Sequence, residues 1–294
     1  MPLISIILPT YNVEKYIARA LESCINQTLK DIEIIVVDDK GQDKSIDIAY
    51  EYANKDSRIK IIHNKENLKL LHARAEGVKV ATSDLIMFLD PDDELELNAC
   101  EILYIHYNNE FKLLRCNFSL IGFDETYNLN VAHSYDEYIQ LSGKHVYYDF
   151  LMWGVLINKQ LYLDCLLLVE EYGLDNINFI EDVTMGFLLI NKTNNYSYIE
   201  NKLYKYYKNT NSLTNSSQFD LKLKLRIINM IIRFFNTMKN KYPQDFNNKI
   251  YISNLYMLIR LKYKSEKELN CNIIGRLLGK ISYEINKLKL KICH

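Results

Sequence analysis

The 294-residue sequence holds only 9 Gly and 4 Pro, which leaves little room for flexible linkers, collagen-like repeats or low-complexity segments. Its six Cys form no CxxC pair and have no His at zinc-finger spacing, so a structural zinc site is not expected. The first apolar run, residues 3–8, is too short for a signal-peptide core or a membrane span. These absences predict a cytoplasmic globular protein with reduced thiols.

The net charge of -1 conceals an uneven distribution, because residues 221–294 contain 16 Lys and Arg but only four Asp and Glu. In this region Lys alternates with Leu and Ile, which predicts basic helices that lie on an anionic membrane surface. The alternative is a helical subdomain packed on the body or on a second subunit, as in a homo-oligomer. The apolar residues Ile227, Ile228, Ile231, Phe234 and Phe235 predict that the first of these helices is buried, leaving the last to meet the membrane. Nucleic acid is not an expected partner, because no motif that reads RNA or DNA accompanies the charge.

Strand and helix signals alternate through the first hundred residues. Strands are expected at 3–8, 32–37, 59–62 and 85–89, and helices at 13–27, 44–54 and 71–80, the first capped by Asn12. A helix at 97–107, a strand at 113–121 and a helix from Glu181 follow. This order predicts an α/β fold with a mostly parallel sheet and helices on both faces. We expect a nucleotide-sugar-binding half at 1–105, an acceptor-binding half at 106–217 and a basic helical C-terminal region at 218–294.

Polar clusters follow three of the expected strands, where ligands of parallel α/β sheets bind. These clusters are Pro9-Thr10-Tyr11, Asp38-Asp39 and Asp90-Pro91-Asp92-Asp93. Three carboxylates within four residues favour a hard divalent cation, Mn²⁺ or Mg²⁺, although Asp92 or Asp93 could instead cap the next helix. A carboxylate of Asp38-Asp39 could accept from a uracil imide, or the pair could serve a turn, and Tyr11 could stack on a base or simply pack.

Together, these segments resemble the four signature segments of family 2 glycosyltransferases. The matching stretches are Ser5 to Asn12, Ile35 to Asp39, Asn67 to Gly77 and Phe88 to Asp93. The resemblance implies the GT-A fold and an inverting, metal-dependent transfer of a sugar from a UDP-sugar. It implies that Pro9, Thr10, Tyr11 and Asp39 hold the nucleotide with Arg74 beside them. It also implies that Asp90 and Asp92 form the DxD motif that binds metal and ribose, with Asp93 sharing in the metal site.

Two positions depart from the family pattern. The family usually has Gly-Ser after the Asp pair, where this chain has Lys40-Gly41, and it usually has Gly where Lys69 stands. Lys69 therefore puts the local loop shape in question.

Further motifs resemble the acceptor side of the same family. Trp153-Gly154 matches an acceptor-binding tryptophan, and Glu181-Asp182 matches a Glu-Asp motif that supplies the general base, with Asp182 first and Glu181 second. The acidic pair could also merely favour a helix start. Lys208 resembles part of a lid that would neutralise the diphosphate.

Within the family, the chain looks similar to bacterial β-1,3-galactosyltransferases of lipooligosaccharide synthesis. That similarity implies UDP-galactose as donor, a GalNAc-terminated glycolipid as acceptor and a peripheral location on the inner face of the inner membrane. The alternatives are UDP-GlcNAc, UDP-GalNAc or UDP-glucose as donor in capsule or other glycan synthesis, and a nucleotide-sugar-binding module without catalysis. A dinucleotide oxidoreductase is disfavoured because the first strand–helix turn lacks GxGxxG. A phosphotransfer protein is disfavoured because no Asp follows the first strand.

Overall fold

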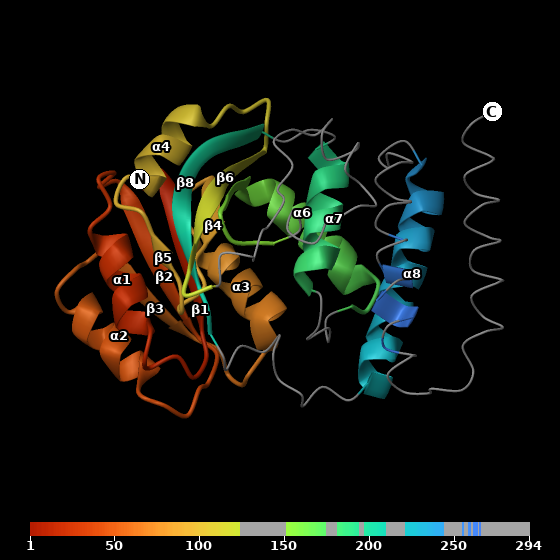
Figure 1. The fold of residues 1–294 in the computed structure, drawn as a ribbon, viewed down its shortest axis with the longest axis horizontal. Coiled ribbons are helices and arrows are strands. Elements are labelled where there is room, and N and C mark those ends of the chain that lie inside the picture. Colours follow the sequence, from red (N-terminus) through yellow and green to blue (C-terminus); the bar gives the residue numbers. More distant parts are fainter. Residues whose placement is uncertain are drawn as a thin grey trace.

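A single mixed sheet forms the centre of the molecule (Figure 1). The computed structural model describes residues 1–123, 151–174, 181–193, 197–209 and 221–243, together with residues 255, 258–259, 261–263 and 265. Within this part, eight strands lie in the order β3-β2-β1-β4-β7-β6-β8-β5. The predicted α/β architecture is therefore confirmed.

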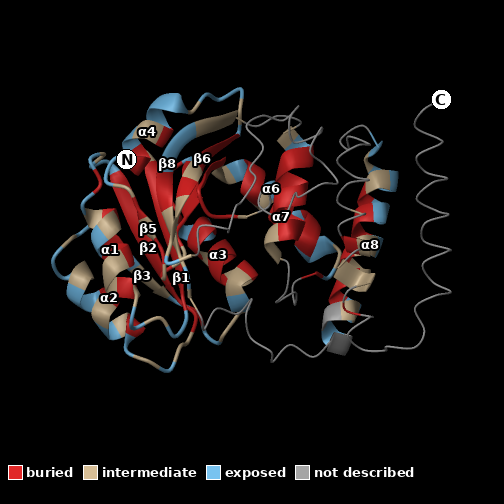
Figure 2. Cartoon of the chain, viewed as in Figure 1, coloured by how far each residue is buried: buried red, intermediate tan, exposed pale blue. Residues whose placement is uncertain are grey.

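The first half of the sheet is parallel and, except at its edge strand, buried on both faces (Figure 2). It consists of β1 (Ile4–Thr10), β2 (Ile32–Asp38), β3 (Ile59–His63) and β4 (Leu85–Phe88), paired in parallel around β1. Every residue of β1, β2 and β4 is buried, which accounts for their nearly continuous apolar sequences. Because β2 and β4 lie on opposite sides of β1, the connection reverses direction there. A ligand crevice is expected at the carboxyl ends of β1 and β4.

The second half of the sheet continues the same surface with mixed pairing. Next to β4 come β7 (Val155–Asn158), β6 (Leu113–Ile121), β8 (Ser197–Tyr207) and the short β5 (Glu94–Leu95). β7 is antiparallel to both neighbours, β8 is parallel to β6, and β5 is antiparallel to β8. Since both halves share one sheet, the boundaries at 105 and 217 stay predictions.

Helices cover both faces of the sheet (Figure 1). One apolar core joins the sheet to α1 (Ile17–Ile25), α2 (Ser45–Ala53) and α4 (Ala99–His106). The other joins it to α3 (Lys69–Val80), α6 (Lys159–Glu171) and α7 (Glu181–Thr193). β1 contributes side chains to both cores, because Ile6 and Leu8 belong to the first and Ile7 belongs to the second.

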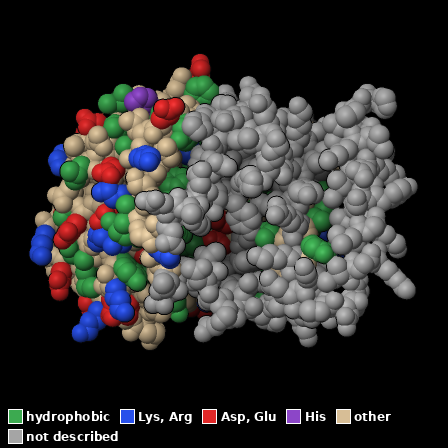
Figure 3. Space-filling view, viewed as in Figure 1, with side chains coloured by type: hydrophobic (Ala, Val, Ile, Leu, Met, Phe, Trp, Pro, Cys, Tyr) green, Lys and Arg blue, Asp and Glu red, His purple; other side chains and the backbone are tan. Residues whose placement is uncertain are grey.

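The first basic helix of the C-terminal region, α8 (Leu221–Lys241), packs beyond α7. Phe235 stacks on Phe187 of α7 with ring centroids 3.7 Å apart, and Ile227, Ile228 and Ile231 are buried. The predicted burial of this helix is confirmed, whereas the predicted membrane contact of the last basic segment falls outside the described residues. No helix in the described part is long and apolar enough to span a membrane. On the described surface in Figure 3, acidic and basic side chains are interspersed.

The prediction that Asn12 caps the first helix is wrong. α1 begins at Ile17 with Tyr16 at its N-cap, so Asn12 lies too far upstream. Asn12 instead adopts a positive φ of 54°, and its side-chain oxygen accepts from the Gln42 amide at 2.7 Å. It thus joins the loop after β1 to the loop after β2.

A buried carboxylate ties the strands together at the edge away from the polar clusters. Glu33 of β2 is 3% exposed. Its Oε1 accepts from the Ser5 hydroxyl at 2.6 Å and from the amide and hydroxyl of Thr82 at 2.6 and 2.8 Å, while Oε2 pairs with Lys60 at 2.6 Å. Burial alone would raise the pKa of Glu33, but these donors lower it to about 2.

We predict that Glu33→Gln lowers the free energy of unfolding at neutral pH by on the order of 2–3 kcal/mol. A lowered carboxyl pKa stabilises the fold above the ordinary value of 4.5, and this contribution is lost as pH falls toward about 2. The difference between wild type and variant in urea unfolding should therefore shrink with acid. Glu76→Gln, which affects an exposed pair with Lys79 at 2.9 Å, is the control and should change little. A pH-independent difference for Glu33→Gln would contradict this account.

Candidate active site

The acid loop, which we define as residues 90–93, begins just beyond β4. Its turn is closed by the Asp93 amide donating to the Asp90 carbonyl at 2.9 Å. Asp93 is 1% exposed, and its two oxygens accept from the Tyr204 hydroxyl and the Tyr207 amide, both at 2.8 Å. Tyr204 also accepts from the Asp90 amide at 3.3 Å. β8 therefore fixes the backbone of the acid loop through Asp93.

Asp92 carries a charge that its surroundings compensate poorly. Its Oδ2 accepts from the Asn209 side-chain amide at 2.8 Å. Burial raises the pKa of the Asp92 carboxyl, and the neighbouring charge of Asp90 raises it further. Burial likewise holds the pKa of Asp93 well above its ordinary value, with the charges of Asp92 and Asp90 adding to the effect. The loop is thus short of positive charge.

Arg74 of α3 joins the acid loop to the start of α7. Its side chain is 4% exposed; one terminal nitrogen lies 3.0 Å from Asp90 Oδ1 and the other 3.7 Å from Glu181 Oε1. Its Nε is buried without a hydrogen-bond partner. One guanidinium therefore brings together two acidic motifs that are 91 positions apart in the printed sequence.

Glu181 and Asp182 form the first turn of α7. Burial raises the pKa of Glu181, the charge of Asp182 raises it further, and Arg74 opposes both. Burial also raises the pKa of Asp182, whose Oδ1 accepts from the Val183 amide at 2.8 Å. A buried carboxylate with a raised pKa is a better proton acceptor than an exposed one.

The ends of β1 and β2 form the other side of the site. Pro9 and Thr10 are buried in β1, with the Thr10 hydroxyl donating to the Leu8 carbonyl at 3.0 Å. Tyr11 just beyond is 43% exposed. An exposed aromatic ring at this edge is available for stacking on a planar base.

The two acids at the end of β2, Asp38 and Asp39, have different partners. Asp38 accepts from the Lys40 amide at 2.8 Å and contacts His63 Nδ1 at 2.7 Å; burial would raise its pKa, but these hydrogen bonds lower it. Asp39 accepts from the amides of Leu68 and Lys69 at 2.7 and 3.0 Å. Asp39 therefore caps the N-terminus of α3, the helix that carries Arg74.

Asp39 also accepts from the Asn64 side-chain amide at 2.8 Å. A carboxylate offers about four acceptor positions. With Asn64 and Leu68 on Oδ1 and Lys69 on Oδ2, about one acceptor position of Oδ2 remains for a ligand.

The two departures from the family pattern both occupy the left-handed backbone region. Lys40 has φ 62° and Lys69 has φ 70°. This conformation is unfavourable for residues other than glycine. The loop shape expected from Gly is therefore kept, and Lys69 still donates its amide to Asp39. At Gly41 an added Cβ would lie 2.8 Å from the Asn12 amide nitrogen, which explains why glycine is needed there.

The predicted acceptor-side residues lie where β7 begins. Trp153 is 5% exposed and stacks on Tyr204 and Tyr206 with centroids 4.7 and 5.1 Å apart. Gly154 has φ 65°, which favours glycine. Lys208 is exposed, and its amide donates to the Ile121 carbonyl at 2.9 Å. Direct contacts of Trp153, Gly154 and Lys208 with substrate stay predictions.

Sequence reasoning missed three residues that surround the acid loop. They are Arg19, Tyr204 and Asn209. The two on β8 and just beyond lie more than 110 positions from the loop in sequence, and a chain with 23 Tyr gives no reason to single out Tyr204. Pairing between β5 and β8 brings them there.

The acid loop has the chemistry expected for a divalent cation. In the described part of the chain, no group of three or more His, Cys, Asp or Glu side chains is arranged as a metal site. Mg²⁺-type sites in phosphate-transfer enzymes commonly use only one or two carboxylates and complete their shell with water and substrate phosphates. The raised carboxyl pKa of Asp92 in the site indicates unmet negative charge. The residues therefore fit a cation that arrives with a diphosphate.

The chain is similar to known glycosyltransferases. The family model described as glycosyl transferase family 2 matches residues 5–157. The Bacillus subtilis protein EpsH is 30% identical over 279 residues, covering 91% of this chain and 80% of EpsH. The cholesterol galactosyltransferase of Borreliella burgdorferi is 26% identical over 309 residues, covering 94% and 83%.

Solved structures share the fold. S. aureus TarS 1–349 in complex with UDP-GlcNAc has a TM-score of 0.68 at 17% identity, covering 90% of this chain and 73% of that 1–349 chain. The mannosyltransferase PcManGT from Pyrobaculum calidifontis, in complex with GDP-Man and Mn²⁺, has a TM-score of 0.52 at 14% identity, covering 96% and 80%. These similarities confirm that this chain has the predicted GT-A fold.

The uncompensated negative charge of Asp92 should lower the stability of the metal-free protein. Because folding raises the pKa of this acid, its ionisation opposes folding as pH rises from the ordinary value toward the raised one. Asp92→Asn should therefore raise the Tm of the metal-free protein near neutral pH. Differential scanning calorimetry measures it.

Asp43→Asn is the matched control with the opposite sign. Burial would raise the pKa of Asp43, but donors from Ser45 and Glu14 lower it, so this substitution should lower Tm. A lower Tm in Asp92→Asn as well would show that the Asp92 charge is already compensated.

Proposed function

The chain belongs to glycosyl transferase family 2, and from this premise we propose that it is a metal-dependent, inverting galactosyltransferase. The donor is UDP-galactose, and the acceptor is a terminal GalNAc of a bacterial surface glycolipid. The acid loop and the ends of β1 and β2 bind the donor, and Asp182 accepts the proton of the acceptor hydroxyl.

The observation that carries this proposal is the contact of Arg74 with both Asp90 and Glu181. It places the start of α7 beside the acid loop, so a carboxylate with a raised pKa lies next to the expected diphosphate. A module that only binds a nucleotide sugar has no use for a proton acceptor there. The contact therefore favours catalysis over binding alone.

On the donor side, the remaining acceptor position of Asp39 suits the imide N–H of uracil, a donor that cytosine lacks. Tyr11, 43% exposed, is the ring that would stack on the base, with Pro9 and Thr10 beneath it. UDP-GlcNAc in the complex of TarS agrees with a uridine nucleotide.

Asp90 and Asp92 are the residues that would hold Mn²⁺ or Mg²⁺ together with the diphosphate. When bound, the ion stabilises the negative charge that develops on the departing UDP. Both oxygens of Asp93 accept hydrogen bonds from β8, which favours a supporting role for Asp93 over direct ligation. Lys208, next to Asn209, adds positive charge on the lid side.

On the acceptor side, Asp182 takes the proton from the acceptor hydroxyl as its oxygen attacks the anomeric carbon. The bond from that carbon to the diphosphate oxygen breaks, and the electron pair leaves with UDP. One displacement inverts the anomeric centre. Glu181 pairs with Arg74, which leaves Asp182 as the base. Trp153 and Gly154 would form part of the acceptor pocket.

The sugar and the location rest on additional support. A cholesterol galactosyltransferase among the relatives agrees with galactose transfer to a lipid acceptor. We propose peripheral binding at the inner face of the inner membrane through the basic C-terminal region, where each basic residue near an anionic surface contributes about 1 kcal/mol. UDP-GlcNAc is the alternative donor, favoured by the complex of TarS.

A panel of UDP-sugars tests the donor and the metal. We expect UDP release from UDP-galactose with Mn²⁺ and a GalNAc-terminated acceptor, and none with EDTA. Faster release from UDP-GlcNAc would replace the donor, and release unaffected by EDTA would contradict the metal site. No release with any donor, acceptor and metal would contradict the enzymatic proposal.

Asp182→Asn tests the base. We predict that kcat falls by ~10² or more, the usual effect of removing a general base, while UDP and Mn²⁺ affinities measured by calorimetry stay at wild-type values. Glu171→Gln, at an exposed pair with Lys241, is the control. Loss of UDP affinity in Asp182→Asn would assign Asp182 to the donor site instead.

A further inference from the structure

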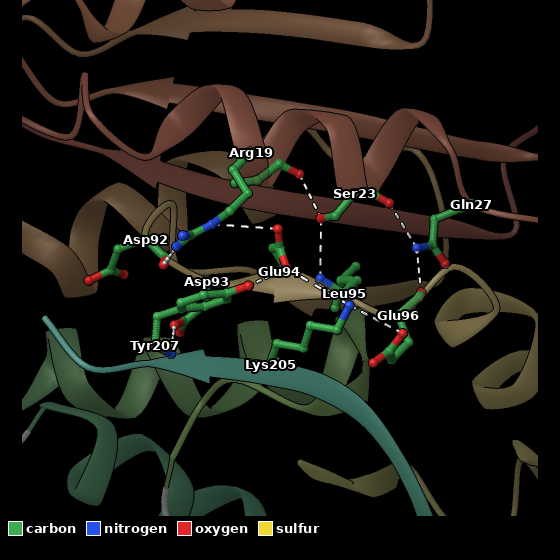
Figure 4. A network of polar contacts seen from close by, with 11 residues as sticks. Arg19, Ser23, Gln27, Asp92, Asp93, Glu94, Leu95, Glu96, Lys205 and Tyr207 are labelled. Atoms are coloured by element: carbon green, nitrogen blue, oxygen red, sulfur yellow. Dashed lines mark hydrogen bonds and ion pairs between the residues drawn. The ribbon is translucent and has the colours of Figure 1, made fainter. Parts of the chain in front are cut away.

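A polar stripe along α1 and just beyond its end binds the backbone that follows the acid loop (Figure 4). Arg19 and Ser23 are four residues apart and therefore share one side of α1, and Gln27 follows just after the C-cap Asn26. The Ser23 hydroxyl accepts from the Leu95 amide at 3.2 Å, and Gln27 Nε2 donates to the Glu96 carbonyl at 2.7 Å. Arg19 completes the stripe by donating to the Asp92 carbonyl.

Arg19 also contacts the end of β8. Its guanidinium carbon lies 3.5 Å from the centroid of the Tyr207 ring, and its Nε lies 3.5 Å from Glu94 Oε1. The Tyr207 hydroxyl donates to the other oxygen of Glu94 at 2.7 Å, and its amide donates to Asp93. One side chain therefore lies between α1, the acid loop and β8, as Figure 4 shows.

Asp92 is consequently held at two points. Arg19 binds its carbonyl oxygen, and Asn209, two residues beyond Tyr207, donates to its carboxylate at 2.8 Å. Loss of Arg19 would release the carbonyl directly. It would also remove the cation under Tyr207, and with it a contact that keeps Asn209 in reach of the carboxylate.

We propose that Arg19 is a positioning residue that sets the orientation of the Asp92 carboxylate toward the cation and diphosphate. This inference rests on the metal site of the proposed function. Groups that orient a metal-binding carboxylate typically alter metal affinity or activity by 10–100-fold when they are lost. Arg19 touches no substrate in this arrangement and acts through Asp92 and Tyr207.

The test compares Arg19→Lys and Arg19→Met with wild type in Mn²⁺ binding in the presence of UDP, followed by the EPR signal of unbound Mn²⁺. Arg19→Lys keeps the charge but loses the planar fork and its stacking, and Arg19→Met also loses the donor. We expect affinity to fall by ~10-fold in Arg19→Lys and by more in Arg19→Met. The KM for the donor should rise in the same order.

Arg58→Lys is the matched control. Arg58 also pairs with a carboxylate, Asp56, at 2.6 Å and donates to a backbone carbonyl, that of Ile25, at 2.7 Å, but it precedes β3 at the opposite edge of the sheet. The Arg58→Lys substitution should lower Tm without changing the affinity for Mn²⁺.

The outcomes separate this inference from the proposal beneath it. Wild-type protein that binds no Mn²⁺ with UDP would overturn the proposed metal site itself. Wild-type protein that binds Mn²⁺ while both Arg19 variants bind it equally well would overturn only the role of Arg19. A fall in Tm like that of Arg58→Lys, with unchanged Mn²⁺ affinity, would make Arg19 a purely structural residue.

Discussion

The site depends on one buried guanidinium among five acids. Arg74 contacts Asp90 on one side and Glu181 on the other, and it is the cation through which the two acidic motifs meet. One positive charge does not compensate Asp90, Asp92, Asp93, Glu181 and Asp182, so burial and mutual repulsion raise the pKa values of the last four. The fold thus leaves uncompensated negative charge at the position where a transferase must bind a diphosphate, and a cation would neutralise it.

The topology of the sheet explains why these groups meet. β1 lies between β2 and β4, so the polar ends of all three strands lie at the same edge of the sheet, where a ligand crevice is expected. α3 delivers Arg74 from one face, and Asp39 anchors the start of that helix through two backbone amides. A single helix, α3, therefore links Asp39 at the end of β2 to Asp90 in the acid loop.

Local patterns predicted the parallel half of the sheet and the acid loop, because each strand there is a mostly apolar run ended by polar residues. They did not predict β5 or the pairing of β8, since a two-residue strand has no periodicity and its partner lies about a hundred positions away. The contacts of Arg19, Tyr207 and Asn209 arise from that pairing. Asn12 was misassigned because an Asx residue before an amphipathic segment suits a loop contact as well as a cap.

The chain contains a single tryptophan, and its position gives it a use beyond packing. Trp153 lies face to face with Tyr204, whose hydroxyl holds Asp93 and meets the backbone of Asp90. A shift of the Tyr204 hydroxyl with the acid loop would therefore move its ring against the sole indole. The intrinsic fluorescence of Trp153 is expected to respond to such a shift in unlabelled protein.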